Sequence, residues 1–430
     1  MDAILITAWD AWVNLFLGTF TLPTGQVFVR LLTGWILCNS RRTITGMIRW
    51  ADPQGRRAHD AYHRFFRDAA WAMEDLWRQL VGVLVKQFYP GGTIIVDLDD
   101  TLFHRTGRKV NGAGWWRDAV RSTRTKIVYA WGLNIVVLTL RIHPPWGGEP
   151  LGLPINMKLH RKNGPSLIEL AEAMLRQLVQ WLPERSFRVG ADGFYASLAG
   201  AKIQTVHMVS RIRRDAVLYD LPPARRKKAR GRPRTRGRKL PSPQRMTRTV
   251  RHWKTVTTCE RGHTRKRQVY ARKVLWYHVS KQPILLVISR DPTGKEKDDF
   301  FITTDLLLNP AEVVSHFAGR WCIEDTFKNT KQLLGGQQPQ TFKRQGPERA
   351  TALSLWLYSL VWLWYLTQKH HQRTFLVWPW YPQKSTPSFA DALNSLRRVL
   401  WQKQIKSMFG KRIVHDKNYE FLIEALASAA

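Results

Sequence analysis

Three carboxylates stand where a metal-dependent site could be built. Asp100 follows the apolar run 94–96, Asp192 follows the short run 189–191, and Glu324 lies in a segment with helical periodicity. Carboxylates from two strand ends and one helix can converge at the edge of an α/β sheet and hold two divalent ions about 4 Å apart. Two metal ions bound in this way activate water or a 3′ hydroxyl for attack on a phosphodiester.

Two cationic residues share the predicted helix with Glu324. Arg320 precedes Glu324 by four positions and Lys331 follows it by seven, so all three are expected on one helical face. Cations on both sides of a metal-binding carboxylate would hold the phosphate groups that approach it. An alternative stays open at this point, because such acids also form simple ion pairs with neighbouring arginine or lysine.

The net charge of the chain indicates a polyanionic partner. Its 430 residues include 68 Lys and Arg against 32 Asp and Glu, which gives a formal net charge of +36. Hydrophobic residues make up 44% of the chain, and this excludes a disordered basic tail because enough apolar surface is present to form a core. A nucleic acid is the polyanion that phosphodiester chemistry would act on.

Much of the positive charge lies in one segment. Residues 211–273 hold 23 Lys and Arg against three acidic residues. The centre of this segment is too rich in charge, proline and glycine to pack, so we expect a loop that faces solvent or DNA. Its candidate DNA-binding residues are Arg225, Arg226, Lys227, Lys228, Arg230, Arg232 and Arg234.

A second basic segment lies near the N-terminus. Arg41 and Arg42 precede the apolar residues Met47 and Ile48 of a predicted helix, as in a helix whose first turn lies on DNA. A basic face that only contacts solvent is the alternative.

Hydrophobic periodicity divides the chain into five regions and predicts an α/β fold. A helical DNA-binding domain is expected first, then an α/β core interrupted by a basic β-rich insertion, and finally a helical C-terminal region. One long helix from about Pro310 to Leu334 would carry Glu324. The predicted boundaries are 1–90, 91–209, 210–281, 282–345 and 346–430.

The segment 317–324, followed by Lys331, resembles the Y-R-E-K signature of the DDE transposases of bacterial cut-and-paste insertion sequences. The first family motif, an acidic residue and then Asp-Thr, is similar to residues 99–101, and the second fits Asp192. The resemblance covers roughly residues 40 to 370. Phe317 replaces the signature tyrosine, so no hydroxyl is available there to contact phosphate.

The resemblance implies a ribonuclease-H-like mixed sheet with an inserted β-rich subdomain and helical terminal domains. It further implies that Asp100, Asp192 and Glu324 are catalytic and bind two Mg²⁺ ions, with Mn²⁺ tolerated. The expected partners are double-stranded DNA, both terminal inverted repeats and target, and a second copy of the chain on that DNA. Such enzymes often stack a flipped base on an aromatic residue, for which the candidates are Phe300, Phe301 and Trp276.

Two other functions compete with this interpretation. Residues 97–101 also fit D-x-D-x-T, the first motif of haloacid-dehalogenase phosphotransferases, in which Asp97 would be the nucleophile and Asp99 the general acid and base. That family leaves the charge of +36 and the basic insertion unexplained. The other alternative is a DNA-binding protein without activity, although all three acids are present.

The remaining sequence features concern location. Three cysteines, far apart and odd in number, favour a reducing compartment, so we expect a cytoplasmic protein at the bacterial nucleoid. The strongest apolar run, 352–366, is shorter than the roughly twenty residues that span a bilayer. We therefore predict a buried helix there and no membrane partner.

Overall fold

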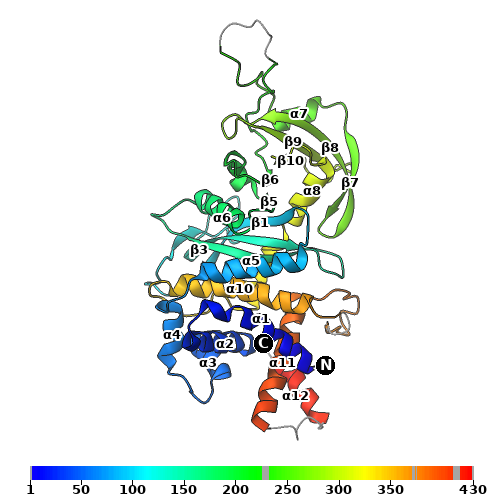
Figure 1. Ribbon diagram of the computed structural model, residues 1–430. Coiled ribbons are helices and arrows are strands. Elements are labelled where there is room, and N and C mark those ends of the chain that lie inside the picture. The colour runs from blue at the N-terminus through cyan, green and yellow to red at the C-terminus, as the bar shows by residue number, and fades with distance from the viewer. Residues whose placement is uncertain (1, 225–231, 370–372, 374, 410–416, 429–430) are drawn as a thin grey trace.

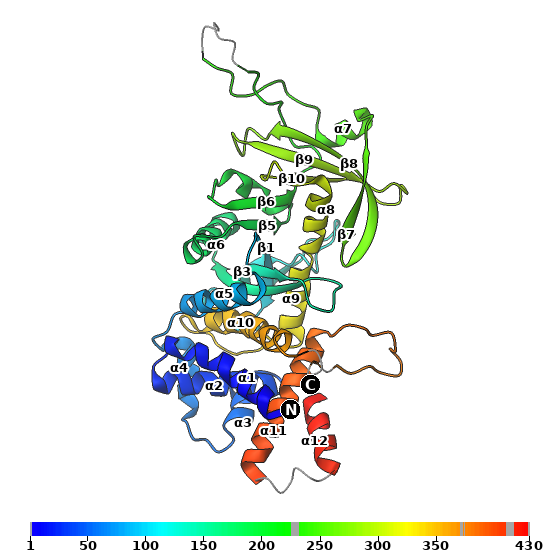
Figure 2. The same ribbon diagram turned by 45° about the vertical axis from the view of Figure 1, so that its right-hand side comes forward.

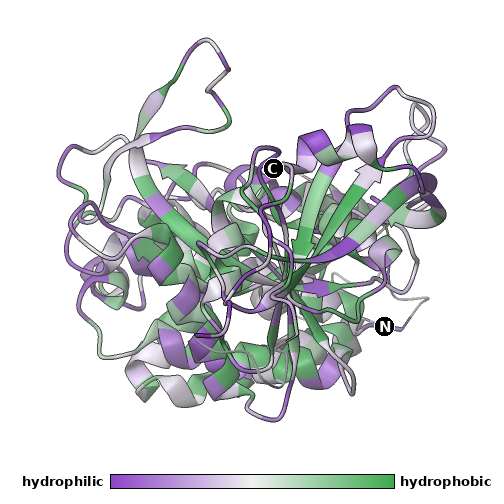
Figure 3. Cartoon of the chain, turned by 90° about the horizontal axis from the view of Figure 1, so that it is seen from above, coloured by the Kyte–Doolittle hydropathy of each residue, from purple (hydrophilic) through white to green (hydrophobic). Residues whose placement is uncertain are grey.

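A computed structural model describes residues 2–224, 232–369, 373, 375–409 and 417–428. Its centre is a single sheet of ten strands, which carries helices on its faces and a helical layer at one end (Figures 1 and 2). Seen from above, the central strands are predominantly hydrophobic, whereas the loops around them are mainly hydrophilic (Figure 3). The apolar runs of the sequence therefore form the core.

Five strands form a ribonuclease-H-like core, as predicted. They lie in the order β4-β3-β1-β5-β6, in which the first three are antiparallel and the last two run parallel to β1. Helix α6 connects β4 to β5 and begins at a capping box between Ser166 and Glu169. The bounds are β1 Ile94–His104, β3 Tyr129–Ile142, β4 Leu151–His160, α6 Leu167–Trp181, β5 Phe187–Ala191 and β6 Val206–Arg211, with the short β2 Gly114–Arg117 also on β3.

The β-rich insertion continues this core sheet. Strand β10 pairs antiparallel with β6, and β9, β8 and β7 follow outward from it. The predicted boundary at residue 281 lies between β8 and β9, which pair from Gln268↔Arg290 to Leu275↔Pro283. The insertion and the second core segment thus share one hydrogen-bonded ladder. The bounds are α7 Pro243–Thr249, β7 Lys254–Glu260, β8 His263–Leu275, β9 Pro283–Arg290 and β10 Asp299–Thr303.

The N-terminal and C-terminal helices pack together at one end of the molecule. In both views α1, α2 and α3 lie beside α11, with α10 between them and the sheet, whereas α5 lies on the sheet side of α10 and contacts β4 (Figures 1 and 2). The N-terminal helices are α1 Asp2–Leu15, η1 Leu17–Thr19, α2 Leu22–Leu37, α3 Ile44–Ala51, α4 His59–Arg67 and α5 Met73–Phe88. The C-terminal helices are α10 Gly346–Leu366, α11 Phe389–Phe409 and α12 Lys417–Ser428.

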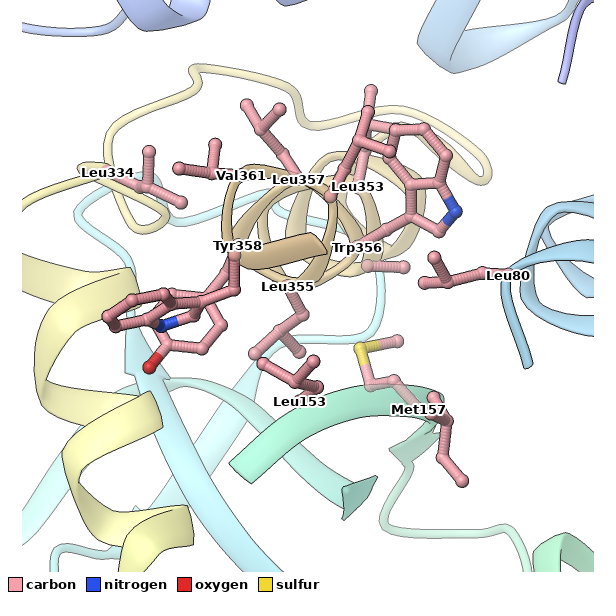
Figure 4. Close-up of a cluster of buried hydrophobic side chains, with 14 of the residues drawn as sticks. Leu80, Leu153, Met157, Leu334, Leu353, Leu355, Trp356, Leu357, Tyr358 and Val361 are labelled. Atoms are coloured by element: carbon pink, nitrogen blue, oxygen red, sulfur yellow. The ribbon is translucent and has the colours of Figure 1, made fainter. Parts of the chain in front are cut away.

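Helix α10 is buried on all sides. Leu355 faces Leu153 and Met157 of β4, while Trp356 on another side of the helix lies toward Leu80 of α5 (Figure 4). A helix covered all round needs no polar face, which explains the uninterrupted apolar run at 352–366. Within the described ranges, no helix combines the length and apolarity that crossing a membrane requires.

The predicted helix 310–334 is divided in two. Helix α8, Pro310–Gly319, ends at a glycine, the residue with the lowest helix propensity after proline. Helix α9, Cys322–Gln332, follows after Arg320 and Trp321 and packs against β1 and β4. Arg320 therefore lies at the junction of the two helices.

Candidate active site

Consecutive aspartates of β1 lie on opposite faces of the sheet, because side chains alternate along a strand. Asp97 and Asp99 lie on the face covered by α8 and α9, whereas Asp100 lies on the other face. In the parallel ladder Leu98 pairs with Ala191, so Asp192 follows β5 at the level of Asp99. This register places Asp99 and Asp192 on the same face of the sheet.

Arg320 joins Asp99 to Glu324. Its guanidinium donates to Asp99 Oδ2 at 2.6 Å and to Glu324 Oε1 at 3.2 Å. The arginine is only 7% exposed. Burial lowers the pKa of Arg320, but the carboxylates of Asp99 and Glu324 outweigh it and raise that pKa overall. One buried cation therefore holds the strand acid and the helix acid together.

The surroundings of Asp99 raise the pKa of its carboxyl strongly. Burial raises its pKa to about 7; Arg320 opposes this rise, and the negative charges of Asp192 and Asp100 add to it. The pKa values of carboxylates rise when burial and neighbouring negative charges disfavour the ionised form. Burial is the main cause of this rise, and the charges of Asp192 and Asp100 are smaller contributions.

Asp100 is held from the other side of the sheet. The Tyr195 hydroxyl, in the short helix η2 (Gly193–Gly200), donates to Asp100 Oδ1 at 2.8 Å. Burial raises the pKa of Asp100; the Tyr195 hydrogen bond lowers it, and the charge of Asp192 raises it further. The structure therefore places Asp100, the predicted first acid, away from α9 and Glu324, and puts Asp99 in that position.

Asp192 caps helix η2. Its Oδ1 accepts a hydrogen bond from the Phe194 backbone N–H at 2.9 Å, and its carbonyl accepts one from the Ser210 hydroxyl at 2.7 Å. Glu324 lies in the first turn of α9, and burial raises its pKa although Arg320 opposes the shift. Asp192 is thus fixed by the backbone around it, and Glu324 by Arg320.

Asp97 belongs to a buried ion pair. It is 0% exposed and accepts from Arg141 Nε at 2.9 Å and from a second guanidinium nitrogen of the same arginine. Gly190 and Gly319 leave the room for this pair, because a Cβ at Gly190 would lie 2.4 Å from Asp97 Oδ1 and one at Gly319 would lie 2.5 Å from Arg141. A carboxylate enclosed in this way cannot attack a substrate, which argues against the phosphotransferase alternative.

Lys331 contacts Thr101, the residue of β1 that follows Asp100. Its Nζ donates to Thr101 Oγ1 at 2.6 Å and lies 5.3 Å from the centre of the Phe103 ring. Burial lowers the pKa of Lys331 to about 8. Arg320 and Lys331, which share a face with Glu324 in the sequence pattern, thus reach β1 at two neighbouring points.

The other predicted DNA-binding residues differ in exposure. Arg41, Arg232 and Arg234 are exposed. Arg42 is 6% exposed and its Nε donates to the Trp35 carbonyl at 3.2 Å, so it stabilises the helical layer and does not present its charge to DNA. Arg225, Arg226, Lys227, Lys228 and Arg230 lie outside the described residues.

The predicted stacking residues are packed into apolar clusters. Phe301 is 3% exposed, and its ring centre lies 4.9 Å from that of Phe317. Phe300 and Trp276 are half-buried beside a second cluster of the insertion. Of the three, Phe301 is therefore enclosed, and Phe300 and Trp276 keep part of their surface exposed.

Two exposed aromatic residues lie beside the acids and were missed by the sequence analysis. Phe194, 54% exposed, is two residues from Asp192, and Trp321, 40% exposed, is three residues from Glu324. The Arg261 guanidinium lies 3.9 Å from the centre of the Trp321 ring. Adjacency to the two motif acids was the signal that could have identified both residues.

The donor set fits a divalent cation. Among the described residues, no three Asp, Glu, His or Cys side chains already gather closely enough to hold a metal ion. The Arg320 guanidinium nevertheless lies between Asp99 and Glu324 as a positive charge and stands in for such an ion. Carboxylate oxygens are the hard ligands that Mg²⁺ prefers.

The fold and these acids define a protein with a ribonuclease-H-like core and a carboxylate-lined site on one sheet face. The family of DDE superfamily endonucleases matches residues 16–283, more than half of the chain, and the chain belongs to this family. No curated protein matches it.

Among solved structures, the chain is similar to the piggyBac transposase in a synaptic complex with hairpin DNA. The identity is 10%, the TM-score is 0.41, and the match covers 98% of this chain and 82% of that one.

Proposed function

We propose that this protein is a DNA transposase that cleaves a phosphodiester at each transposon end and joins the freed 3′ hydroxyl to target DNA. The observation that carries the proposal is the link that Arg320 makes between Asp99 and Glu324, with Asp192 following β5 at the level of Asp99. Membership of the DDE superfamily endonucleases supports the same class of reaction.

The acid from β1 is proposed to be Asp99. The first family motif resembles residues 99–101 as a whole, and only Asp99 shares the face of Glu324. Asp100 lies on the opposite side of the sheet, where Tyr195 holds it by a hydrogen bond. Its negative charge is proposed to raise the affinity of the site for cations. This assignment replaces Asp100 with Asp99 in the expected set of acids and keeps Asp192 and Glu324.

Two Mg²⁺ ions, when bound, would activate the attacking oxygen and stabilise the leaving oxygen of the phosphodiester. Asp99, Asp192 and Glu324 would hold them, and Mn²⁺ would be accepted because its ligand preference is similar. The residues around the acids position the DNA. Lys331 attracts the phosphates next to the scissile bond, and Arg320 would do so once its hydrogen bonds to Asp99 and Glu324 are released, which contributes affinity more than sequence preference.

The exposed basic residues are proposed to bind the DNA outside the site. Arg41 lies on the helical layer, and Arg232 and Arg234 lie on the insertion, so contacts at both would hold a duplex on either side of the acids. Two transposon ends must be joined to one target, and we therefore propose a homodimer on DNA. Terminal inverted repeats and target DNA are the proposed partners, at the bacterial nucleoid.

Strand cleavage of a labelled duplex that carries the sequences flanking the gene tests this function. With Mg²⁺ or Mn²⁺, Asp99→Asn, Asp192→Asn and Glu324→Gln should each lower the cleavage rate by more than about a hundredfold. Asp325→Asn is the matched control, because Asp325 is an exposed acid on the same helix. It should cleave at the wild-type rate.

DNA affinity, measured separately in the absence of metal, should change little in all of these variants because the basic surface dominates it. Asp100→Asn should be milder than Asp99→Asn. The reverse order would assign the first acid to Asp100, as the sequence motif suggests. Wild-type protein that binds the duplex and never cleaves it would favour the inactive DNA-binding alternative.

A further inference from the structure

A cavity lies at the last residue of β1, apart from the acids. Its volume is about 680 Å³, within the roughly 300–1,000 Å³ of small-ligand sites. Residues 104–110 form one wall, and residues 337–342 form another. Because His104 ends β1 five positions beyond Asp99, a rise of roughly 3.3 Å per residue puts the cavity about 17 Å from that acid along the strand.

Hydrogen bonds through two glutamines fix the walls of this cavity. The His104 backbone N–H donates to Gln337 Oε1 at 2.6 Å, and the Arg42 backbone N–H donates to Gln338 Oε1 at 2.8 Å. Because both amide oxygens accept from the backbone, the Nε2 group of each glutamine remains as a donor. The cavity is therefore preformed, and its glutamines offer N–H groups to a ligand.

Arg105 gives the cavity wall a buried positive charge. It is 8% exposed, and its terminal nitrogens donate to two uncharged acceptors, the Gln337 carbonyl and Thr351 Oγ1. Burial lowers the pKa of Arg105 to about 10, and across the described parts of the chain no carboxylate opposes this shift. A buried charge without a counter-ion is unfavourable, so an anion in the cavity would stabilise the folded chain.

Two polar atoms of the wall lack a hydrogen-bond partner. Neither Arg105 Nε nor Thr341 Oγ1 is hydrogen-bonded within the described residues, although both atoms are buried. Thr341 is 8% exposed and lines the same cavity. Buried polar groups in folded proteins are nearly always hydrogen-bonded, so two unpartnered atoms in one wall indicate a site for a polar ligand.

The rest of the wall favours a phosphomonoester among the possible anions. None of the lining residues is acidic, and Arg108 and Lys109 add exposed positive charge. A phosphate group with several acceptor oxygens suits a wall that consists of donors. Inorganic phosphate alone would fill only a small part of the volume, and the buried Val110 and Pro339 offer apolar surface to a carbon skeleton.

We propose that this cavity binds a small phosphomonoester, with its phosphate near Arg105 and Thr341 and its carbon skeleton against Val110. Two sources supply this chemistry, a free sugar phosphate and the 5′-phosphate at the end of a DNA strand. The walls belong to the loop after β1 and to the segment before α10. A bound phosphomonoester would therefore connect these two segments and stabilise the folded chain.

Calorimetric titration of the full chain with ribose 5-phosphate, at constant ionic strength and without divalent metal, tests this proposal. Wild-type protein should bind one ribose 5-phosphate per chain, and ribose should not bind. Thr341→Val should weaken the affinity about tenfold, because it removes a hydrogen bond to a charged group, and Arg105→Met should abolish binding. Thr341→Val should fold normally, since the hydroxyl that it removes has no partner in the described chain.

Arg245→Met is the matched control for the general attraction of anions by a basic chain. Arg245 is an exposed arginine on α7 and does not line the cavity, and its replacement removes the same charge as Arg105→Met. This control should bind ribose 5-phosphate as the wild type does. Equal affinities in Arg105→Met and Arg245→Met overturn the cavity as the binding site. Circular dichroism of each variant establishes that the fold is retained.

Two duplexes of one sequence, with and without a 5′-phosphate, distinguish the two sources. Tighter binding of the phosphorylated duplex, lost in Thr341→Val, assigns the phosphomonoester to a DNA end. Binding of ribose 5-phosphate without a preference between the duplexes assigns it to a free sugar phosphate. If neither ligand binds in a way that depends on Arg105 and Thr341, the proposal is wrong. Because no cleavage is measured, failure of the transposase proposal would appear only in the cleavage assay.

Discussion

Arg320 and Asp99 are 221 positions apart in the chain, and the guanidinium of the first donates to the carboxylate of the second at 2.6 Å. The same arginine reaches Glu324, so one side chain connects strand β1 to helix α9. The guanidinium of Arg320 occupies the place between these carboxylates that a bound metal ion is proposed to take. Removal of Arg320 and addition of metal are therefore expected to affect the same pair of carboxylates.

Arg320→Ala should destabilise the metal-free protein by about 1–3 kcal/mol, because it leaves the partly buried Asp99 carboxylate without its partner. Added Mn²⁺ should then raise the thermal midpoint of the variant more than that of the wild type, because Arg320 no longer competes for the carboxylates and stabilisation by a bound cation grows with the logarithm of its affinity. Thermal unfolding with chelator and with Mn²⁺ measures both effects. An equal Mn²⁺-induced shift in the two proteins would show that the metal does not use these carboxylates.

Asp97→Ala should lower the free energy of unfolding by about 3–5 kcal/mol, because Arg141 would remain buried without a counter-ion. Gly190→Ala should lower it by about 1–3 kcal/mol, since the new Cβ would meet Asp97 Oδ1. The two effects should not be additive, because the alanine at position 97 removes the atom that the added methyl group would meet. Urea unfolding of both single variants and the double variant checks this coupling, and strict additivity would contradict it.

Lys331 should contribute to DNA affinity in a pH-dependent way. Burial lowers its pKa to about 8, so the ammonium is largely charged at pH 7 and largely neutral at pH 9. The affinity ratio of wild type to Lys331→Ala should therefore fall toward one as the pH rises through 8. Lys331→Arg stays charged throughout this range, and its ratio to Lys331→Ala should remain constant. Titrations without metal at pH 7, 8 and 9 measure both ratios, and parallel curves for lysine and arginine would refute the assignment.

Much of the fold could be predicted from the sequence because the core strands are continuous apolar runs. The segments that became β1 and β3 consist of residues that favour strands, and the order of strands and helix indicated an α/β core. The basic insertion was visible from its charge. Its strands were also visible, but their union with the core depends on the pairing of β10 with β6, and no local pattern encodes a pairing between distant segments.

The site was predicted in outline, and its details depend on strand alternation. Asp99 and Asp100 are adjacent in sequence, and only the position of α9 shows which of them shares the face of Glu324. The separation of α8 from α9 was missed because Arg320 and Trp321 keep helical backbone angles across the junction. The burial of Arg42 and Phe301 was missed for a different reason. Arginine and phenylalanine also occur on surfaces that bind DNA, so the residue type alone does not indicate burial.

The position of α10 also determines when the chain can complete its fold during synthesis. Residues 346–366 cover apolar surface of β4 and of the N-terminal helices, all of which leave the ribosome earlier. At roughly 5–20 residues per second, the N-terminal helices wait on the order of tens of seconds for the helix that covers them. During that interval the nascent protein exposes the surface that α10 later buries, so chaperone supply is expected to limit its yield more than the stability of the finished protein does.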